Sequence, residues 1–373
     1  MLRNHELYTM KLTEIISFLE QVAPPSYQET YDNSGLIYGN PEMDIKAALI
    51  CLDSTEAIVD EAIKTGCNLI IAHHPIVFSG IRKLNGKNYV ERTLIKAIKN
   101  DIAIYAIHTN LDNVAAGVNR EICDRLGLQN PKILQPKSGL LKKLVTFAPT
   151  EVVDKVKNAL FAAGAGSIGN YDECSFSLAG TGTFRGNEQS KPVIGVPLQR
   201  EELTESRIEV LFESRLQTSV LHALRNSHPY EEIAFDIYSI DNQHQNVGSG
   251  MIGELPAPLN QDQFLKLVKE SMKTACIRYT ASSHEKISKV AVCGGSGSFL
   301  VKDALSAGAQ AFITADFKYH QFFDGEGRLL IADIGHYESE QFTKDLIYKL
   351  LTGKFTTFAV RLSELNTNPI NYF

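Results

Sequence analysis

Paired cysteines, long apolar segments and an excess of positive charge are all missing from this 373-residue chain. Its six cysteines are isolated, with no CxxC pair, which argues against a thiolate metal site or a redox motif and favours a reduced, cytosolic environment. No apolar run approaches the ~18 residues needed to span a bilayer. The formal net charge of −6 argues against a non-specific nucleic-acid binder, which usually has a basic excess.

The N-terminus also lacks the apolar centre of a secretory signal, because MLRNHELYTM is polar. A clean amphipathic pattern begins only at Met10, with KLTEIISFLEQV. The nine residues before Met10 are therefore interpreted as an extension, or as a consequence of the choice of start site. We expect a cytoplasmic protein with no membrane segment.

Length and patterning indicate a divided α/β protein. A chain of 373 residues is too long for one ordinary core and suggests two or three domains. Apolar strands alternate with amphipathic helices in the first half, with strands expected at 47–53, 68–74 and 102–112 and a helix at 113–127. The same rhythm resumes with the strand expected at 286–295. Such alternation is typical of sheets with much parallel pairing.

A differently patterned segment, 138–243, separates these halves. It is expected to contain a strand, a helix, a hairpin within YDECSFSLAGTGTFRG, and then a further strand, helix and strand. This order suggests a small ferredoxin-like unit. We interpret it as an inserted domain, because the flanking parts, 1–137 and 244–373, share the same alternation of apolar strands and amphipathic helices, and each looks incomplete alone.

Three segments carry histidine or carboxylate side chains where a predicted apolar strand ends. They are IIAHHP, AIHTNLD and IADIGHYESE. The carboxyl ends of parallel strands share one edge of an open sheet, where ligands bind. In the third segment a histidine and a glutamate are four residues apart at a helix start, so both project from one face. The three segments together predict a metal site whose ligands are His73, His74, Asp112, His336 and Glu340.

Each motif also has a purely structural explanation. Adjacent histidines on a strand project to opposite sides, so His73 and His74 could be one core residue and one surface residue. His336 and Glu340 could form a surface ion pair, and Asp112 could cap the helix that follows it. Their joint occurrence at three strand ends favours the metal site. Imidazole and carboxylate without thiolate suit Zn, Mn, Fe, Co or Ni.

Three further features are candidates for a role in the same cleft. The turn from Cys293 to Ser298 joins a strand to a helix and could present backbone N–H groups to a phosphate, or could simply be a tight turn. It lacks the lysine of a P-loop and the spacing of a dinucleotide-binding fingerprint. His108 and His320 could act as proton shuttles or hydrogen-bond to ligands, although an isolated histidine is more often structural.

Several motifs in this order resemble the Nif-three-like dinuclear metal-centre proteins, often described as GTP cyclohydrolase 1 type 2 homologues. The motifs are YDNSGL, AHHPIVF, HTNLD, TADFKYH and DIGHYESE, and the resemblance runs from about Met10 to the C-terminus. The middle segment, with GTGTF and HPYEEIAFDIY, looks like the family's inserted domain, which is similar to the PII and CutA folds. The resemblance therefore implies a two-part α/β core interrupted by that domain.

The resemblance also implies two divalent metal ions per chain, with zinc as the first expectation. Carried over by position, His73 and Asp112 would bind one ion, His74 and His336 the other, and Glu340 would bridge both. Members of the family form ring-like hexamers, so a homohexamer enclosing a cavity is expected. Tyr31 departs from the tryptophan found in many members, which should matter little to the metals.

Open coordination positions on two metals would allow them to activate water, which predicts a metal-dependent hydrolase. The expected substrate is a nucleotide or related small molecule, with His108 or His320 as proton shuttle. Neither a membrane nor a nucleic acid is expected as partner. The alternative is a regulatory or metal-handling protein whose inserted domain binds a small molecule or a partner, because fold alone does not determine function.

Overall fold

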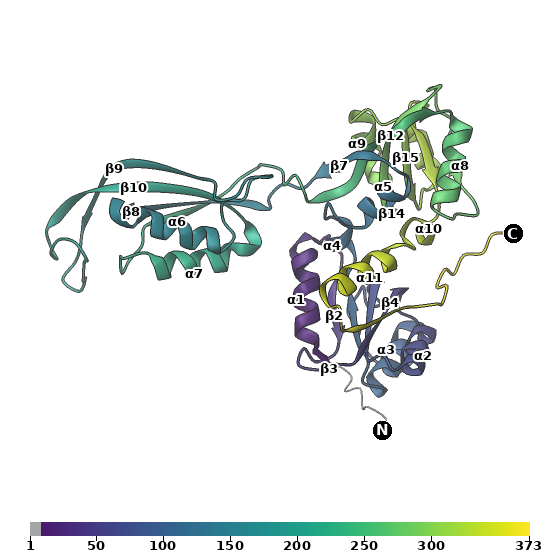
Figure 1. Cartoon of the computed structure of the whole chain (residues 1–373), viewed down its shortest axis with the longest axis horizontal. Helices are drawn as coiled ribbons and strands as arrows, with labels where there is room; N and C mark the ends of the chain where they lie inside the picture. The colour runs from purple at the N-terminus through teal and green to yellow at the C-terminus, as the bar shows by residue number, and fades with distance from the viewer. Residues whose placement is uncertain (1–8) are drawn as a thin grey trace. The chain divides into compact units, whose positions relative to one another are not determined.

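The computed structural model describes residues 9–373 and divides the chain into two compact units (Figure 1). One unit, the core, is formed by the chain up to Gln135 together with Asn246–Phe373; the other, the inserted unit, is Pro136–Gln245. The inserted unit thus extends two residues beyond the expected segment at each end. The interpreted extension before Met10 lies outside the described residues, apart from Thr9.

The first half of the core is built on a five-stranded sheet. Its strands are, in spatial order, β17 (Ala359–Leu362), β4 (Ala47–Asp53), β5 (Leu69–His74), β6 (Ala103–Ala106) and β2 (Gly35–Tyr38). All pair in parallel except β2. Helices α2 (Glu56–Thr65) and α3 (Tyr89–Lys99) contribute Ile58, Val59 and Leu94 to a hydrophobic cluster with strand residues. The parallel sheet expected from the apolar runs is confirmed.

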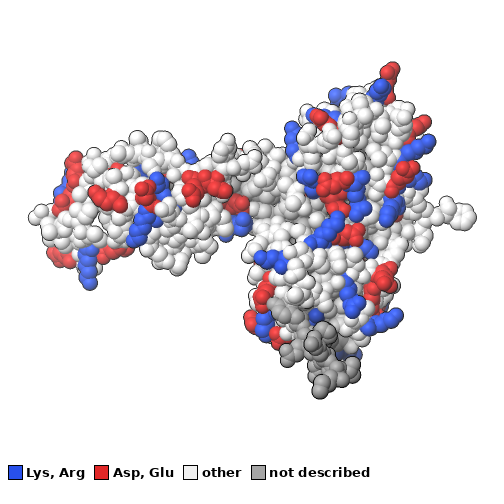
Figure 2. All heavy atoms as spheres, viewed as in Figure 1, with Lys and Arg blue, Asp and Glu red and all other residues white. Residues whose placement is uncertain are grey.

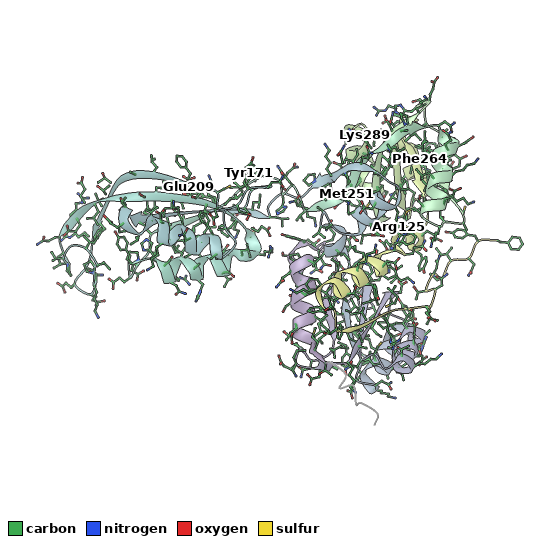
Figure 3. The ribbon with its side chains drawn as sticks, viewed as in Figure 1. Arg125, Tyr171, Glu209, Met251, Phe264 and Lys289 are labelled. Atoms are coloured by element: carbon green, nitrogen blue, oxygen red, sulfur yellow. The ribbon has the colours of Figure 1, made fainter. Side chains whose placement is uncertain are left out.

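The second half contains a six-stranded sheet. In spatial order it comprises β13 (Arg278–Tyr279), β16 (Leu330–Asp333), β15 (Ala311–Ala315), β14 (Ile287–Ser296), β12 (Gly248–Leu259) and β7 (Gln129–Pro136). β14, β15 and β16 are parallel, whereas β12 and β13 pair antiparallel with them. Met251 on β12 and Phe264 on α8 (Gln261–Ser271) are buried (Figure 3). The strand expected at 286–295 corresponds to β14, which lies between β15 and β12 near the middle of this sheet.

The strand expected at 102–112 and the helix expected at 113–127 are both longer than the elements that the structure contains there. β6 ends at Ala106, a short helix α4 covers Thr109–Asp112, and α5 begins at Val118. The backbone N–H of His108 bonds to the Asn110 side chain instead of a neighbouring strand, which ends the strand. A Cβ atom on Gly117 would lie 1.7 Å from the carbonyl oxygen of Leu111, so only glycine allows this tight approach.

The inserted unit has the strand order of a ferredoxin-like fold. Its elements are β8 (Leu141–Pro149), α6 (Val153–Ala162), β9 (Ser175–Arg185), β10 (Arg200–Glu213), α7 (Gln217–Ser227) and β11 (Phe235–Ser239). The strands form an antiparallel sheet in the order β11–β8–β10–β9, and α6 and α7 lie on the same side of it (Figure 1). The ferredoxin-like prediction is confirmed.

The prediction of a hairpin within 171–186 is wrong. β9 is one continuous strand that pairs along its length with β10. Its glycines do not turn the chain. Gly182 instead lies beneath the side chain of Glu205, since a Cβ there would meet a carboxylate oxygen at 2.0 Å.

The surface charge is mixed. Figure 2 shows Lys and Arg interspersed with Asp and Glu on the visible face of the core, with no field of one sign. Among the helices formed by residues 9–373, none combines the length and the apolar character that crossing a bilayer requires.

Candidate metal centre

The predicted metal ligands come from three elements at one edge of the core. His73 and His74 end strand β5, Asp112 ends the short helix α4, and α10 (His336–Glu340) begins shortly after β16. His73 is fully buried, and Glu340 is 2% exposed. The burial of Glu340 rules out the surface ion pair that was the structural alternative for the His336–Glu340 pair.

Four histidines converge here, and each has its Nδ1 atom fixed by an oxygen acceptor. The contacts are His73 to the Ile107 carbonyl (2.9 Å), His74 to Asp53 (2.7 Å), His108 to Asp32 (2.8 Å) and His336 to Asp316 (2.6 Å). Because carbonyl and carboxylate oxygens accept, each Nδ1 is the donor in these contacts, which leaves each Nε2 as the nitrogen that can bind a metal once it is deprotonated. This is the arrangement that orients histidines toward a metal.

Glu340 lies among these Nε2 atoms and uses its two oxygens separately. Its Oε2 is 2.9 Å from Nε2 of His74 and 3.1 Å from Nε2 of His336. Its Oε1 is 3.8 Å from Nε2 of His73. The ligand atoms therefore form two groups that share Glu340, one with His74 and His336 and the other with His73 and Asp112.

Two buried polar atoms in the second group have no hydrogen-bond partner among residues 9–373. They are Nε2 of His73 and Oδ1 of Asp112, which are 3.6 Å apart. Unpaired buried polar atoms are rare, and a metal ion is one of the groups that satisfies them. The two donors are types that bind Zn and similar divalent ions. The residues present therefore fit a metal.

The ionisation of the cluster reflects crowded charges in a buried space. Burial, reinforced by the charge of Glu340, raises the pKa of Asp112 to about 8. The charge of Glu340 is also the main cause that raises the pKa of His336 to about 11. Burial disfavours the charge of Glu340, yet His336 and the other histidines hold its pKa well below the usual value. Positive charge close to Asp112 and Glu340 thus favours the ionised forms of both carboxylates, which burial disfavours.

The irregular, glycine-containing end of β14 (Ile287–Ser296) places its backbone against Glu340. Gly295 has φ +62°, and a Cβ there would lie 2.5 Å from Oε1 of Glu340. The N–H groups of Gly294 and Gly295 donate to the side chains of Asn119 and Ser339. Those two N–H groups are therefore already engaged, so this part of the segment is an irregular strand end and neither of them is available to a phosphate.

A cavity of about 600 Å³ opens over the cluster. Five of the seven predicted site residues line it: His74, His108, Asp112, His336 and Glu340. His73 is buried beside them, with its ring 4.9 Å from that of His74. His320 does not line the cavity; it is exposed on a short helix, and its ring contacts Tyr319 and Phe323. The structure brings six predicted residues together and leaves His320 apart.

Sequence reasoning missed the three carboxylates that hold the histidines. Asp53 ends β4 beside His74 on β5, and Asp316 follows β15. Both therefore obey the rule that identified the histidines, namely that polar side chains at the carboxyl ends of parallel strands meet at one edge of the sheet (the strand-end rule). Asp32 lies in a loop and accepts hydrogen bonds from His108 and Thr109. These hydrogen bonds, with the charge of His108, lower the pKa of Asp32 although burial opposes them. A search for carboxylates at every strand end could have found the first two.

Comparison with known proteins gives a consistent result. The sequence profile of the DUF34/NIF3 (NGG1p interacting factor 3) family matches residues 10–369. Proteins named GTP cyclohydrolase 1 type 2 homolog from Halalkalibacterium halodurans and Bacillus subtilis are 38% and 35% identical, each over 96% of this chain and 98% of the relative. A Bacillus cereus protein related to NIF3, of known crystal structure, is 37% identical with a TM-score of 0.84, covering 99% of this chain and all of that one.

Proposed function

This chain belongs to the DUF34/NIF3 (NGG1p interacting factor 3) family, and on that basis we propose that it is a metal-dependent hydrolase of a nucleotide or related small molecule. The observation that carries the proposal is the convergence of histidine Nε2 atoms with the buried carboxylate of Glu340 and the partly buried carboxylate of Asp112 beneath a cavity. The names of the relatives agree with a small nucleotide-like substrate.

We assign the ligands to two divalent ions that share Glu340. His73 and Asp112 would hold one ion, and His74 and His336 the other, because the two glutamate oxygens face these two groups separately. Zinc is the first expectation, and Mn, Fe, Co or Ni would accept the same nitrogen and oxygen donors. When bound, such ions activate water and polarise the bond to be hydrolysed.

His108 is the residue that we assign to proton transfer. Its Nδ1 donates to Asp32, which fixes the ring, while the ring lies 5.2–5.3 Å from those of His73 and His74. Its Nε2 is therefore the atom available to take or return a proton in the cavity. His320 has no such position, so we assign it no part in the reaction.

A second candidate function follows from a cavity in the inserted unit. This cavity, of about 690 Å³, lies among residues of β9, β10 and the loops that follow β9 and α7. It supports the alternative of a regulatory protein whose inserted unit binds a small molecule. The two functions differ in what happens at the core: only the hydrolase converts a substrate.

The test is a screen of the purified, metal-loaded protein against nucleotides and phosphoesters. We expect turnover that disappears on chelation, returns on adding metal, and is abolished in Glu340→Gln. His320→Gln is the matched control, because it removes an exposed histidine outside the cavity, and it should retain full activity. Turnover that survives complete metal removal would refute the proposal.

A further inference from the structure

The mouth of the core cavity carries aromatic rings that the metal cluster does not require. Four aromatic side chains line the cavity although they are largely exposed: Tyr31 (69%), Phe78 (53%), Tyr89 (61%) and Phe299 (57%). Exposed aromatic rings concentrated around one opening usually mark a binding site. They come from separate elements, so their meeting is not a consequence of one apolar segment.

The positions of these rings connect them to the reactive centre. Phe78 follows β5, and its ring is 5.7 Å from that of His108 in an edge-to-face arrangement. Tyr31 precedes Asp32, the residue that holds His108. Phe299 lies in the short helix η4 (Ser298–Leu300), which follows the end of β14 that lies against Glu340. Phe78, Tyr31 and Phe299 thus belong to segments next to the metal centre, and their exposed rings line the cavity over it.

The charge of the lining is the second observation. Among the described residues that line the cavity there is no lysine or arginine, whereas four are acidic: Glu29, Asp53, Asp112 and Glu340. Sites that bind polyphosphates generally supply lysine or arginine in addition to metal. Here the positive charge for an anion must come from the metals alone, after part of it is neutralised by the ligand carboxylates.

A simple charge count sets the limit. Two divalent ions bring four positive charges, and the ligands Asp112 and Glu340 cancel two of them. A single phosphate group carries about −1.5 to −2 at neutral pH, and a triphosphate carries roughly twice that. The remaining charge matches one phosphate. A triphosphate would leave negative charge unpaired beside Glu29 and Asp53.

We propose that this cavity binds a small molecule with a planar heteroaromatic ring and no more than one phosphate group. Phe78 stacks on the ring, Tyr31 and Phe299 pack around it, and the three together determine specificity, while the phosphate or the reacting group lies at the metals. The inference rests on the proposed hydrolase function and narrows its substrate class. A nucleoside monophosphate fits this description, and a nucleoside triphosphate does not.

Equilibrium dialysis of the metal-loaded full chain tests the proposal by binding, with the ligand recovered intact and identified afterwards. The probes are GMP, GTP and ribose 5-phosphate, which has a phosphate but no aromatic ring. We expect GMP to bind more tightly than GTP and more tightly than ribose 5-phosphate. Phe78→Ala should weaken the binding of GMP by on the order of tenfold, the usual effect of losing one stacking ring. The binding of ribose 5-phosphate should be unchanged.

Two variants serve as controls. Phe78→Tyr retains the ring and should restore GMP binding, and Tyr319→Ala removes an aromatic side chain that is 73% exposed but does not line the cavity, so it should have no effect. Tighter binding of GTP than GMP, or equal loss of GMP and ribose 5-phosphate in Phe78→Ala, would overturn the proposal. A change of native mass in Phe78→Ala would also overturn it, by showing that the ring joins copies of the chain.

The binding measurements separate this inference from the proposed hydrolase. If GMP binds with the expected pattern but no substrate is converted, the hydrolase proposal fails and the ring-binding cavity stands. If ring-free phosphoesters are hydrolysed as efficiently as nucleotides, the hydrolase stands and the ring-binding inference fails.

Discussion

Gly295 and Glu340 are in such close contact that a Cβ atom on the glycine would lie 2.5 Å from Oε1 of the glutamate. The glycine also has φ +62°, a left-handed conformation that side chains disfavour. The irregular end of β14 therefore fixes the position of the carboxylate that both groups of ligand atoms share. Replacing this glycine should disturb the metal centre without removing any ligand.

We predict that Gly295→Ala lowers metal content by displacing Glu340. The backbone strain alone should cost about 1–2 kcal/mol of folding stability. Gly308→Ala is a matched control, since Gly308 has φ +75° and its nearest atom, Nζ of Lys289, would be 3.9 Å from the new Cβ. Elemental analysis and thermal unfolding of both variants check this. Equal metal content in the two variants would contradict the role assigned to Gly295.

Replacing Glu340 with Gln should reduce metal loading more than replacing any single histidine with Gln. The carboxylate faces both ligand groups and offsets the repulsion between two cations, whereas each histidine serves one. The loss of affinity should exceed the roughly 10–100-fold effect of removing a residue that only hydrogen-bonds to a ligand. Elemental analysis with competition by a chelator would measure it. Near-normal content of two metals in Glu340→Gln would rule out the shared position.

Metal binding should release protons, and affinity should rise with pH through the neutral range. Burial lowers the pKa of His74, but its bonds to Asp53 and Glu340 outweigh this and raise it to about 9, and Glu340 raises that of His336 to about 11. At pH 7 both rings therefore bind a proton that a metal must displace. Lowering the pH strengthens the competing proton, so affinity falls.

Calorimetry in buffers of different ionisation enthalpy counts the protons released. Asp316→Asn should lower the pKa of His336 and so shift the pH dependence of metal binding toward lower pH, because Asp316 is one of the groups that raise that pKa. Binding with no net proton release at pH 7 would show that the histidines are neutral before the metal arrives.

The strand-end rule explains which parts of this centre the sequence could predict. It identified His73 and His74 because an apolar run of β-strand length stops at them, and His336 with Glu340 because helical spacing puts them on one face. It placed Asp112 on a strand that in fact ends at Ala106. The early end depends on a bond from the His108 backbone to the Asn110 side chain, which apolar patterning does not reveal.

The supporting carboxylates were harder to predict for a physical reason. Asp53 pairs with His74 across neighbouring parallel strands, a relationship fixed by register and not by sequence spacing. Asp32 reaches His108 from a loop, 76 positions away along the chain. In the inserted unit, Gly182, one of the glycines that suggested a turn, instead allows the Glu205 side chain to lie over β9.

Deleting 138–243 and joining the ends with a short linker should leave a folded core that binds metal. The strands that lead into and out of the insertion, β7 and β12, are hydrogen-bonded neighbours in one sheet. Near the junction, the His244 N–H donates to the Lys137 carbonyl at 2.7 Å, so a short linker can span the gap. None of the proposed ligands lies in the deleted segment. Circular dichroism and elemental analysis decide; a soluble, folded product without metal would show that the core depends on the insertion.

The final prediction concerns assembly. Resemblance to the family implies a homohexamer, and closed symmetric rings are a common way for one surface to be used repeatedly. Enclosed metal sites would admit small molecules and exclude folded duplex DNA, and a formal net charge of −6 gives no electrostatic attraction to the duplex. Light scattering should therefore give a native mass near six chains of 41.3 kDa, and any activity should be confined to small substrates. Each single-residue variant described above should keep that mass if its effect is local. A stable monomer, or metal-dependent cleavage of intact duplex DNA, would contradict an enclosed site.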